Sequence, residues 1–442
     1  MASETNGIGE KRAAAIISLG CSKNLVDSER LMAMLKNVGV SVRHEPKRLR
    51  KEDIVIVNTC GFIQDAKEES VNTILEYADA RRRGRIAGLY VMGCLSQRYH
   101  DILPGEIPEV DGWYGKTDWP SLVSDLARRF PATAPYDRVI TTPRHHAYLK
   151  IAEGCDRFCA FCAIPLITGR YHSRPVEEIL DEVRLLVSRG VKEFNVIAQD
   201  LSAYGKDLEG NRSRLAELID RMADIEGVRW IRLHYAYPSD FPYDILEVMR
   251  RRDNVCKYLD IALQHISDKV LDNMRRHIDA AQTRRLLARL REEVPGIHIR
   301  TTLMTGFPGE GEKEFEELID FVKEQRFERM GAFAYCEEED TYAARNLKDE
   351  IPDEVKQNRL DRLMAVQEEI SAEIQQQKVG TTVKVIIDRE EEDYYIGRTQ
   401  WDSPEVDPEV LVDKSIKLTK GEFYDVKITS ATPFELFATA RY

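Results

Sequence analysis

Three closely spaced cysteines, Cys155, Cys159 and Cys162, form the pattern C-x-x-x-C-x-x-C. A cluster of four irons and four sulfides is usually held by one thiolate on each iron. Three thiolates leave the fourth iron open to a ligand from a substrate or cofactor. The alternatives are three inert buried cysteines or a zinc site, which takes four ligands and commonly two C-x-x-C pairs. No second pair is near in the sequence, so the spacing predicts an iron–sulfur cluster with one open iron.

A second set of cysteines, Cys21, Cys60 and Cys94, is dispersed, but each member follows a short apolar stretch that is typical of a strand. The carboxyl ends of parallel strands share one edge of a sheet, where ligands bind. We therefore expect three thiolates to converge there and to hold a second cluster. The alternative is three separate buried cysteines, since free cysteine is commonly buried. Cys256 and Cys336 fall outside both sets and are expected to be structural.

Other polar and glycine-containing segments are also expected at strand ends. Active sites of parallel barrels lie at the carboxyl ends of the strands, so side chains there are candidates for binding a cofactor. Each segment, taken alone, is also explained by an ordinary strand-ending turn. The candidates are Gln199, Asp200, Gln264, His265, Gly306 and Pro308, the last two within Thr-Gly-Phe-Pro-Gly-Glu at 305–310.

The elements that position these residues alternate between strands and helices, which predicts an α/β chain with parallel sheets. Residues 1–145 are expected to form an α/β domain, with strands at 14–20, 54–58 and 86–93 and helices at 24–38 and 66–80. Residues 146–376 are expected to form a partial TIM-type barrel. Its six strands are expected at 148–152, 193–198, 230–234, 258–263, 297–302 and 330–335. The clearest helix, 175–189, has one apolar stripe, a proline in its first turn and a glycine at its end.

The composition changes after a long polar helix expected at 352–378. Short alternating stretches rich in β-branched and aromatic residues follow, separated by turn residues. This pattern predicts a small antiparallel β-barrel over residues 377–442. Its strands are expected at 383–388, 394–399, 410–412, 423–430 and 436–440.

The chain has 442 residues and a net charge of −12, which suits two to four domains and disfavours a nucleic-acid substrate. No apolar run is long enough to span a membrane, and the polar first 13 residues lack the apolar core of an export signal. A cytoplasmic protein is therefore expected. In such a chain, eight cysteines indicate metal binding or catalysis rather than disulfides.

The cysteine spacing at 155–162 resembles the signature of the radical S-adenosylmethionine superfamily, and residues 305–310 resemble the glycine–proline motif beside its cofactor. The resemblance implies that the open iron binds S-adenosylmethionine. It also implies that an electron from the cluster cleaves the sulfonium and releases a 5′-deoxyadenosyl radical, which takes hydrogen from an unactivated carbon. The protein binds, orients and shields this chemistry.

The three expected domains together resemble the methylthiotransferase family over nearly the whole chain, with a TRAM-like barrel at the end. The resemblance implies two 4Fe-4S clusters, of which the second, on Cys21, Cys60 and Cys94, carries the sulfur that is inserted. One S-adenosylmethionine supplies the methyl group and another the radical. An electron donor such as flavodoxin or ferredoxin and a sulfur donor are implied as partners. Cys336 and Asp340 stand where the family commonly has serine and glycine, and neither is expected to be a ligand.

Family branches act on transfer RNA, and one branch acts on a ribosomal protein. Gly-Cys-Ser-Lys-Asn at 20–24, Asn-Thr-Cys-Gly-Phe-Ile at 58–63 and Trp-Asp-Ser-Pro-Glu-Val-Asp at 401–407 resemble the protein-modifying branch. RNA-modifying relatives commonly have Gly-Cys-Gln-Met-Asn at the first stretch and tend to carry an arginine soon after the cysteine of the second. The resemblance implies methylthiolation of the β-carbon of an aspartate in ribosomal protein twelve of the small subunit.

Acidic residues of the last domain agree with this branch. RNA-binding barrels use a basic face and stacking aromatics, whereas an acidic surface complements a basic ribosomal protein. The alternative is an acidic surface that is merely solvated. A transfer RNA adenosine methylthiotransferase is the nearest rival function. A non-catalytic electron carrier would not need residues 305–310 or a whole barrel. The acidic residues are Glu390, Glu391, Glu392, Asp393, Asp402, Glu405, Asp407 and Glu409.

Overall fold

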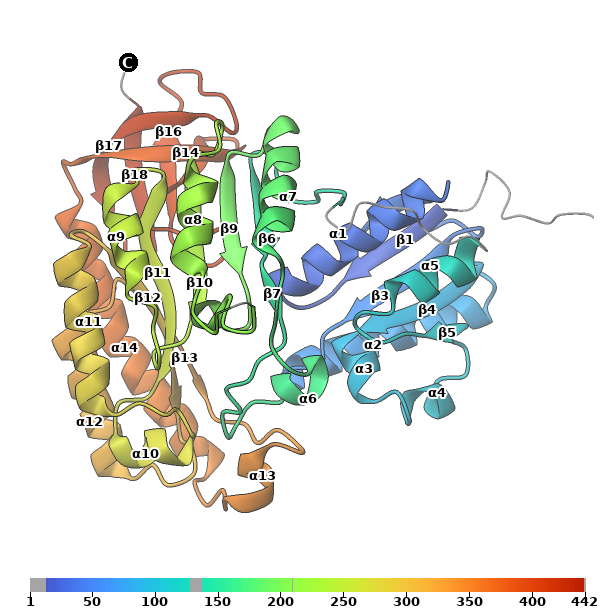
Figure 1. Cartoon of the computed structure of the whole chain (residues 1–442), viewed down its shortest axis with the longest axis horizontal. Coiled ribbons are helices and arrows are strands. Elements are labelled where there is room, and N and C mark those ends of the chain that lie inside the picture. The colour runs from blue at the N-terminus through green and yellow to red at the C-terminus, as the bar shows by residue number, and fades with distance from the viewer. Residues whose placement is uncertain (1–12, 128–136, 209, 441–442) are drawn as a thin grey trace, which may run out of the picture. The chain divides into compact units, whose positions relative to one another are not determined.

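The computed structural model describes residues 13–127, 137–208 and 210–440, which fold as two compact units (Figure 1). The first unit comprises residues 1–142, 153–156 and 163–182, and the second comprises 143–152, 157–162 and 183–442. The first 12 residues, which were expected to carry no export signal, lie outside the described residues.

The first unit contains a parallel sheet with the strand order β2-β1-β3-β4-β5. Its strands are β1 (Ala13–Ser18), β2 (Ser41–His44), β3 (Ile54–Thr59), β4 (Gly88–Gly93) and β5 (Gly112–Trp113). The predicted strands correspond to β1, β3 and β4. The pattern did not predict β2 and β5, because β5 has only two residues and β2 is mostly polar.

Helices cover both faces of this sheet. Leu31 and Leu35 of one helix and Leu122 of another pack on one face, and Ile74 and Ala78 pack on the other. The helices of this unit are α1 (Ser22–Asn37), α2 (Gln64–Arg82), α3 (Cys94–Arg98), α4 (Leu103–Glu106), α5 (Trp119–Ala127) and α6 (Ile164–Thr168). Because the core fills both faces, the strand ends are the place where loops can hold a ligand.

The second unit contains an open sheet of six parallel strands in the order β13-β12-β11-β10-β9-β6, as predicted for a partial barrel. Its strands are β6 (His146–Lys150), β9 (Glu193–Ile197), β10 (Trp230–Ala236), β11 (Val255–Gln264), β12 (His298–Thr305) and β13 (Arg329–Ala334). After β6 the chain passes into β7 (Ala152–Glu153), which pairs with β8 (His172–Ser173).

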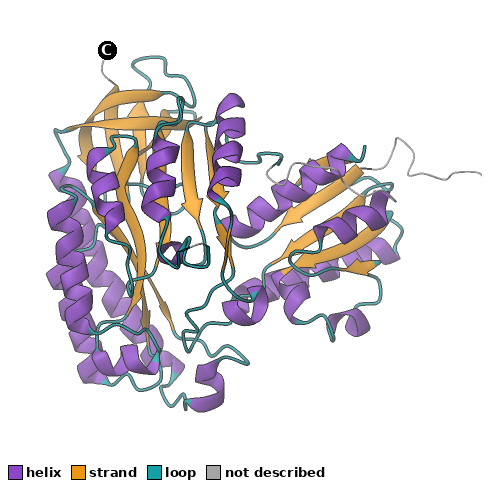
Figure 2. Cartoon of the chain, viewed as in Figure 1, coloured by secondary structure: helices purple, strands orange, loops and turns teal. Residues whose placement is uncertain are grey.

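Helices run along one side of this open sheet, as Figure 2 shows. The longest, α14 (Asp353–Gln377), packs on β12 and β13. The remaining helices of this part of the chain, not all of which lie along the sheet, are α7 (Val176–Ser188), which spans the boundary of the units in sequence, α8 (Leu215–Ala223), α9 (Asp244–Arg251), α10 (Asp268–Asn273), α11 (Ala280–Glu293), α12 (Glu312–Gln325) and α13 (Tyr342–Asn346). In the part of the chain that the structure describes, no helix has the length and apolar character needed to cross a membrane.

The last domain is a closed barrel with the strand order β14-β15-β16-β18-β17. The prediction of a purely antiparallel barrel is wrong in one place, because β16 and β18 pair in parallel. A closed ring of five strands cannot alternate in direction all the way round, so one pair must be parallel. The strands are β14 (Thr382–Glu390), β15 (Tyr394–Thr399), β16 (Glu409–Asp413), β17 (Phe423–Ala431) and β18 (Glu435–Ala440).

An apolar cluster joins this barrel to the open sheet within the second unit. Ile386 and Phe423 pack against Trp230, Cys256 and Tyr258, with the Trp230 and Phe423 rings 4.8 Å apart. Burial raises the pKa of Cys256 to about 11, so this thiol is neutral and structural, as expected.

Cys336 differs from the structural role expected of it. The residue is exposed just beyond β13, where no core surrounds it. The nearby Asp340 has a φ of 64°, in the left-handed region that glycine adopts most readily and that aspartate tolerates. A glycine would adopt this backbone conformation without strain.

Candidate functional site

The dispersed cysteines all lie at the carboxyl edge of the N-terminal sheet, where the sequence placed them. Cys60 directly follows β3, Cys94 begins α3 directly after β4, and Cys21 precedes α1 beyond the end of β1. Gly20 packs closely against Cys60, because a Cβ on this glycine would lie 2.8 Å from the Cys60 Sγ. Burial raises the pKa of Cys94 to about 12, Lys116 opposes this shift, and the neighbouring Cys21 and Cys60 thiols add to it. The three cysteines therefore share one edge of one sheet.

Two buried asparagines hold the loops that carry these cysteines. The Asn24 Nδ2 donates to the backbone oxygens of Leu19, at 3.0 Å, and Thr59, at 2.8 Å. The Asn58 Nδ2 donates to the Asn24 backbone oxygen and to the Ser28 Oγ, each at 2.9 Å. Sequence reasoning quoted both asparagines as parts of motifs but did not assign them this role. Their signal is an amide side chain beside a strand end, where backbone groups need partners.

A serine fixes the loop of Cys60 in the same way. The Cys60 N–H donates to the Ser70 Oγ at 3.0 Å, and the Ser70 hydroxyl donates back to the Cys60 backbone oxygen at 2.9 Å. Lys116, which sequence reasoning also missed, is only 4% exposed and pairs with Glu153. The pKa of the Lys116 amine rises to a value outside the physiological range: burial opposes this shift, but Glu153, Asp27 and Cys94 outweigh it. The charge of this buried cation lowers the pKa of the Cys94 thiol, against the effect of burial.

The closely spaced cysteines lie in the loop that follows β7. Gly154 turns the chain into this loop with a φ of 77°, and an added Cβ would lie 2.0 Å from the Arg170 backbone oxygen. The Cys155 N–H donates to the Gly169 backbone oxygen at 3.2 Å, and the Cys162 N–H donates to the Cys159 backbone oxygen at 3.0 Å. These constraints leave little freedom at the start of the loop.

The middle of the same loop is anchored to two segments of the second unit. The Ala160 N–H donates to the Met274 backbone oxygen at 2.9 Å, and the Ala343 N–H donates to the Ala160 backbone oxygen at 2.8 Å. The Cys159 Sγ accepts a hydrogen bond from the Arg276 Nη1 at 3.2 Å and lies 3.5 Å from the Tyr237 hydroxyl. The donor set suits a thiolate that carries negative charge.

Asp200 lies just beyond β9, next to Gln199. One of its oxygens accepts from the Arg157 Nε at 2.6 Å, and the other accepts from the Ser202 N–H at 2.9 Å. Arg157 belongs to the cysteine loop, so Asp200 ties that loop to the end of β9.

Gln264 is the last residue of β11 and is 8% exposed, with a φ of 71°. Its Oε1 is buried and has no hydrogen-bond partner among the described residues. Buried polar atoms are normally paired, so an unpaired one at a strand end indicates a position where a ligand can bind. This observation fits a bound cofactor.

His265 holds the glycine–proline turn instead of offering a free nitrogen. Its Nε2 lies 3.1 Å from the Glu310 Oε2, and its Nδ1 accepts from the Ser267 N–H at 3.0 Å. The other Glu310 oxygen accepts from the Gly306 N–H at 2.9 Å and from the Arg359 Nη1 at 2.8 Å. His265 thus acts on the turn through Glu310, which accepts a hydrogen bond from the Gly306 backbone.

Gly306 and Pro308 are fixed by packing. A Cβ on Gly306, which has a φ of 74°, would lie 2.2 Å from the Lys356 Cγ. The Pro308 backbone oxygen accepts from the Asn273 Nδ2 at 3.0 Å. The turn at 305–310 is therefore a rigid feature at the end of β12.

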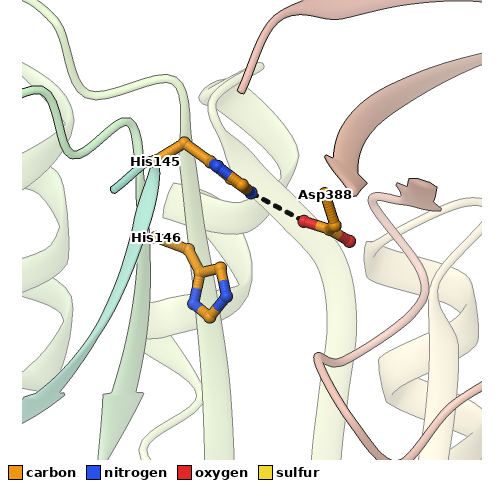
Figure 3. A group of neighbouring side chains, drawn as sticks. All are labelled: His145, His146 and Asp388. Atoms are coloured by element: carbon orange, nitrogen blue, oxygen red, sulfur yellow. Dashed lines mark hydrogen bonds and ion pairs between the residues drawn. The ribbon is translucent and has the colours of Figure 1, made fainter. Parts of the chain in front are cut away.

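Three possible metal ligands also meet at the opposite end of β6. His145, His146 and Asp388 have ligand atoms within 4.8 Å of one another (Figure 3). The His145 Nε2 lies 2.7 Å from one Asp388 oxygen, but the Arg398 guanidinium donates to both oxygens, at 2.6 and 2.9 Å. A divalent cation would lie against this guanidinium and be repelled. We interpret the group as a buried polar junction with the C-terminal barrel.

The acidic face expected on the C-terminal barrel is smaller than predicted. Asp402 is only 1% exposed and accepts from the Arg329 Nε at 3.2 Å. Asp407 accepts from the Tyr258 hydroxyl at 3.1 Å and pairs with Arg300 at 3.5 Å. The two carboxylates pair with the half-buried Arg300 of β12 and the buried Arg329 of β13, which the sequence could not reveal. The acidic residues that remain exposed include Glu405 and the turn 390–393.

Three family models match the chain. The model described as "Radical SAM superfamily" matches residues 149–322, "Uncharacterized protein family UPF0004" matches 13–115 and "TRAM domain" matches 379–440. These segments coincide with the open barrel, the N-terminal sheet and the closed barrel.

Curated relatives match almost the whole chain. A protein of Parabacteroides distasonis named "Ribosomal protein uS12 methylthiotransferase RimO" is 61% identical over 97% of this chain and 98% of its own. A protein of the same name from Phocaeicola vulgatus is 60% identical over 96% and 98%.

Among solved structures, the radical S-adenosylmethionine methyltransferase TsrM of Kitasatospora setae has a TM-score of 0.53 at 15% identity, over 73% of this chain and 75% of that chain. The cobalamin-dependent radical enzyme OxsB has a TM-score of 0.52 at 13% identity, over 82% and 56%. At these identities the likeness concerns the fold alone.

Proposed function

Because the chain belongs to the ribosomal protein uS12 methylthiotransferase family, we propose that it transfers a methylthio group to the β-carbon of an aspartate in uS12, the ribosomal protein twelve of the small subunit. The observation that carries the proposal is the 61% identity over 97% of the chain. The radical domain implies a 4Fe-4S cluster and S-adenosylmethionine. When bound, these groups supply the radical that takes a hydrogen atom from the substrate carbon.

In this proposal, Cys155, Cys159 and Cys162 hold the radical cluster. The hydrogen bonds that fix their loop support the assignment, because a cluster needs its thiolates held in place before it binds. Gln199, Gln264 and the turn at 305–310 would contact S-adenosylmethionine at the strand ends. The unpaired Gln264 Oε1 suits an amine or hydroxyl donor of that cofactor.

Cys21, Cys60 and Cys94 would hold a second 4Fe-4S cluster that carries the inserted sulfur. Their position at one sheet edge, beside the buried Lys116, supports this role, because a cation stabilises a group of thiolates. One S-adenosylmethionine would supply the methyl group and another the radical. A reduced flavodoxin or ferredoxin would supply electrons, and a separate donor would replace the sulfur. We place the reaction in the cytoplasm, because the proposed substrate is a ribosomal protein.

Transfer RNA is the rival substrate. The exposed acidic turn at 390–393 favours a basic protein, since an acidic surface repels a phosphate backbone.

The test is a reaction of the reconstituted enzyme with S-adenosylmethionine, a reductant, sulfide and either uS12 or unmodified transfer RNA. Mass spectrometry should find one methylthio group on an aspartate of uS12. Cys159→Ala serves as the inactive control. A methylthio group on an adenosine of transfer RNA, with uS12 unchanged, would overturn the substrate assignment.

A further inference from the structure

Arg276 is a buried cation that donates a hydrogen bond to Cys159, in the loop that carries the closely spaced cysteines. The residue is 2% exposed and its Nη1 donates to the Cys159 Sγ at 3.2 Å. Its Nη2 donates to the Ala262 backbone oxygen, and its buried Nε has no hydrogen-bond partner among the described residues. A buried cation is costly unless an anion compensates it. The Cys159 sulfur is therefore the group that this charge is placed to meet.

The backbone on both sides of Arg276 and the side chain of Tyr237 fix the orientation of the Arg276 side chain. The residues on both sides, Arg275 and His277, have φ angles of 56° and 54°, a region that costs non-glycine residues free energy. The Tyr237 hydroxyl donates to the Arg276 backbone oxygen at 3.1 Å, and the guanidinium carbon lies 4.1 Å from the centre of the Tyr237 ring. Two unfavourable backbone conformations and an aromatic platform thus fix one side chain.

We propose that Arg276, held by Tyr237, is a positioning residue that raises the reduction potential of the radical cluster through its hydrogen bond to Cys159. The inference rests on the proposed role of Cys159 as a cluster ligand. Reduction adds one negative charge to a cluster, and a fixed cation and an N–H donor at a ligand sulfur both stabilise that charge. A neutral thiol would not compensate the Arg276 charge, whereas a thiolate bound to the cluster would.

The test is a redox titration of the full chain, followed by electron paramagnetic resonance. The radical cluster is recognised by the change in its signal when S-adenosylmethionine is added. Arg276→Gln removes the charge and keeps the polar shape, and should make the cluster about tenfold harder to reduce, a fall of about 59 mV in midpoint for one electron. Arg276→Lys keeps the charge and should shift the midpoint less.

Arg275→Gln is the matched control, because this neighbouring arginine is exposed and stacks on Tyr342 instead. Its midpoint should equal that of the parent. Unchanged iron content with an unchanged midpoint in Arg276→Gln would overturn the proposal.

If Arg276→Gln fails to retain the radical cluster, Arg276→Lys decides instead, because it keeps a charge but loses the planar guanidinium that donates to the Cys159 Sγ. A midpoint below that of the parent in Arg276→Lys would support the proposal, and a parental midpoint in this variant would overturn it. The titration needs no uS12, so its outcome is separate from that of the substrate assignment.

Discussion

Six cysteines stand in two groups of three, and each group is expected to bind its own 4Fe-4S cluster. A reconstituted chain should hold about eight irons, since each cluster has four. Replacing Cys155, Cys159 and Cys162 together by alanine should leave about four. A colorimetric iron assay with protein quantified by amino-acid analysis measures this. A triple variant that kept all its iron would contradict the assignment.

The two groups should also separate the half-reactions. Cys159→Ala should abolish formation of 5′-deoxyadenosine, because the radical cluster loses a ligand. Cys60→Ala should retain some cleavage of S-adenosylmethionine but form no methylthiolated uS12. Chromatography of the nucleoside and mass spectrometry of uS12 follow the two steps in one reaction. Full product from Cys60→Ala would rule out a second cluster on the N-terminal sheet.

The sequence predicted where the cysteines lie but few of the residues that hold them. Spacing identifies a ligand set because thiolates must meet one metal group. Hydrogen-bond partners such as Asn24 with Thr59, or Arg276 with Cys159, are far apart in the chain and are chosen by the fold. The same reason explains why Asp402 and Asp407 were expected on the surface: their arginine partners are 73 and 107 residues away.

At the scale of elements, long periodic segments were predicted well. All six strands of the open sheet, the five strands of the closed barrel and the long helix α14 occur close to their predicted positions. Short elements such as β2, β5, α4 and α6 were missed, because two to five residues carry too little periodicity. Their formation depends on contacts with the rest of the fold.

The turn at Gly154 begins the loop that carries Cys155, Cys159 and Cys162, and the position of this loop depends on it. Gly154→Ala should destabilise the chain by roughly 3 kcal/mol, because the left-handed φ is strained and the Cβ meets the Arg170 backbone oxygen. Gly84→Ala is the control, since that glycine, just after α2, also has a positive φ, of 66°, but open space around it, and should cost only about 1 kcal/mol. Urea unfolding measures both, and equal losses would show that the close contact does not matter.

At the scale of the whole molecule, buried charges join the closed barrel to the open sheet. Burial alone would raise the pKa of Glu193. The guanidinium groups of Arg398 and Arg232 outweigh this effect and lower the pKa to about 2. Burial lowers the pKa of His146 from 6.5 to about 4. In both cases the unfolded chain binds the proton more readily than the folded chain, so stability is complete above pH 6.5 and declines as the pH falls.

Urea midpoints of unfolding should therefore fall between pH 6.5 and 4 because of His146, and further toward pH 2 because of Glu193. His146→Phe should flatten the upper part of this dependence and leave the lower part. A variant with the parental slope between pH 6.5 and 4 would show that His146 is already charged in the folded chain.

Binding of the substrate protein depends on the charged residues exposed on the surface of the molecule. Since Asp402 and Asp407 are buried, reversing their charge would disrupt the junction and would not test binding. The acidic turn of the β14–β15 hairpin does test it, because Glu392 and Asp393 are exposed. Replacing both by lysine should weaken binding of basic uS12 by roughly threefold to tenfold, and more at low salt, where exposed charges are screened least.

The matched control reverses Glu368 and Glu369, two exposed carboxylates of α14, and changes the net charge by the same amount. If the turn is the contact, this control should bind uS12 nearly as the parent does. Titrations of isolated uS12 and of unmodified transfer RNA at two salt concentrations measure the affinities. Equal weakening by both variants would indicate a response to net charge alone. Tight, salt-sensitive binding of transfer RNA with no affinity for uS12 would instead favour the RNA-modifying function, because a phosphate backbone would then have found a basic face elsewhere on the chain.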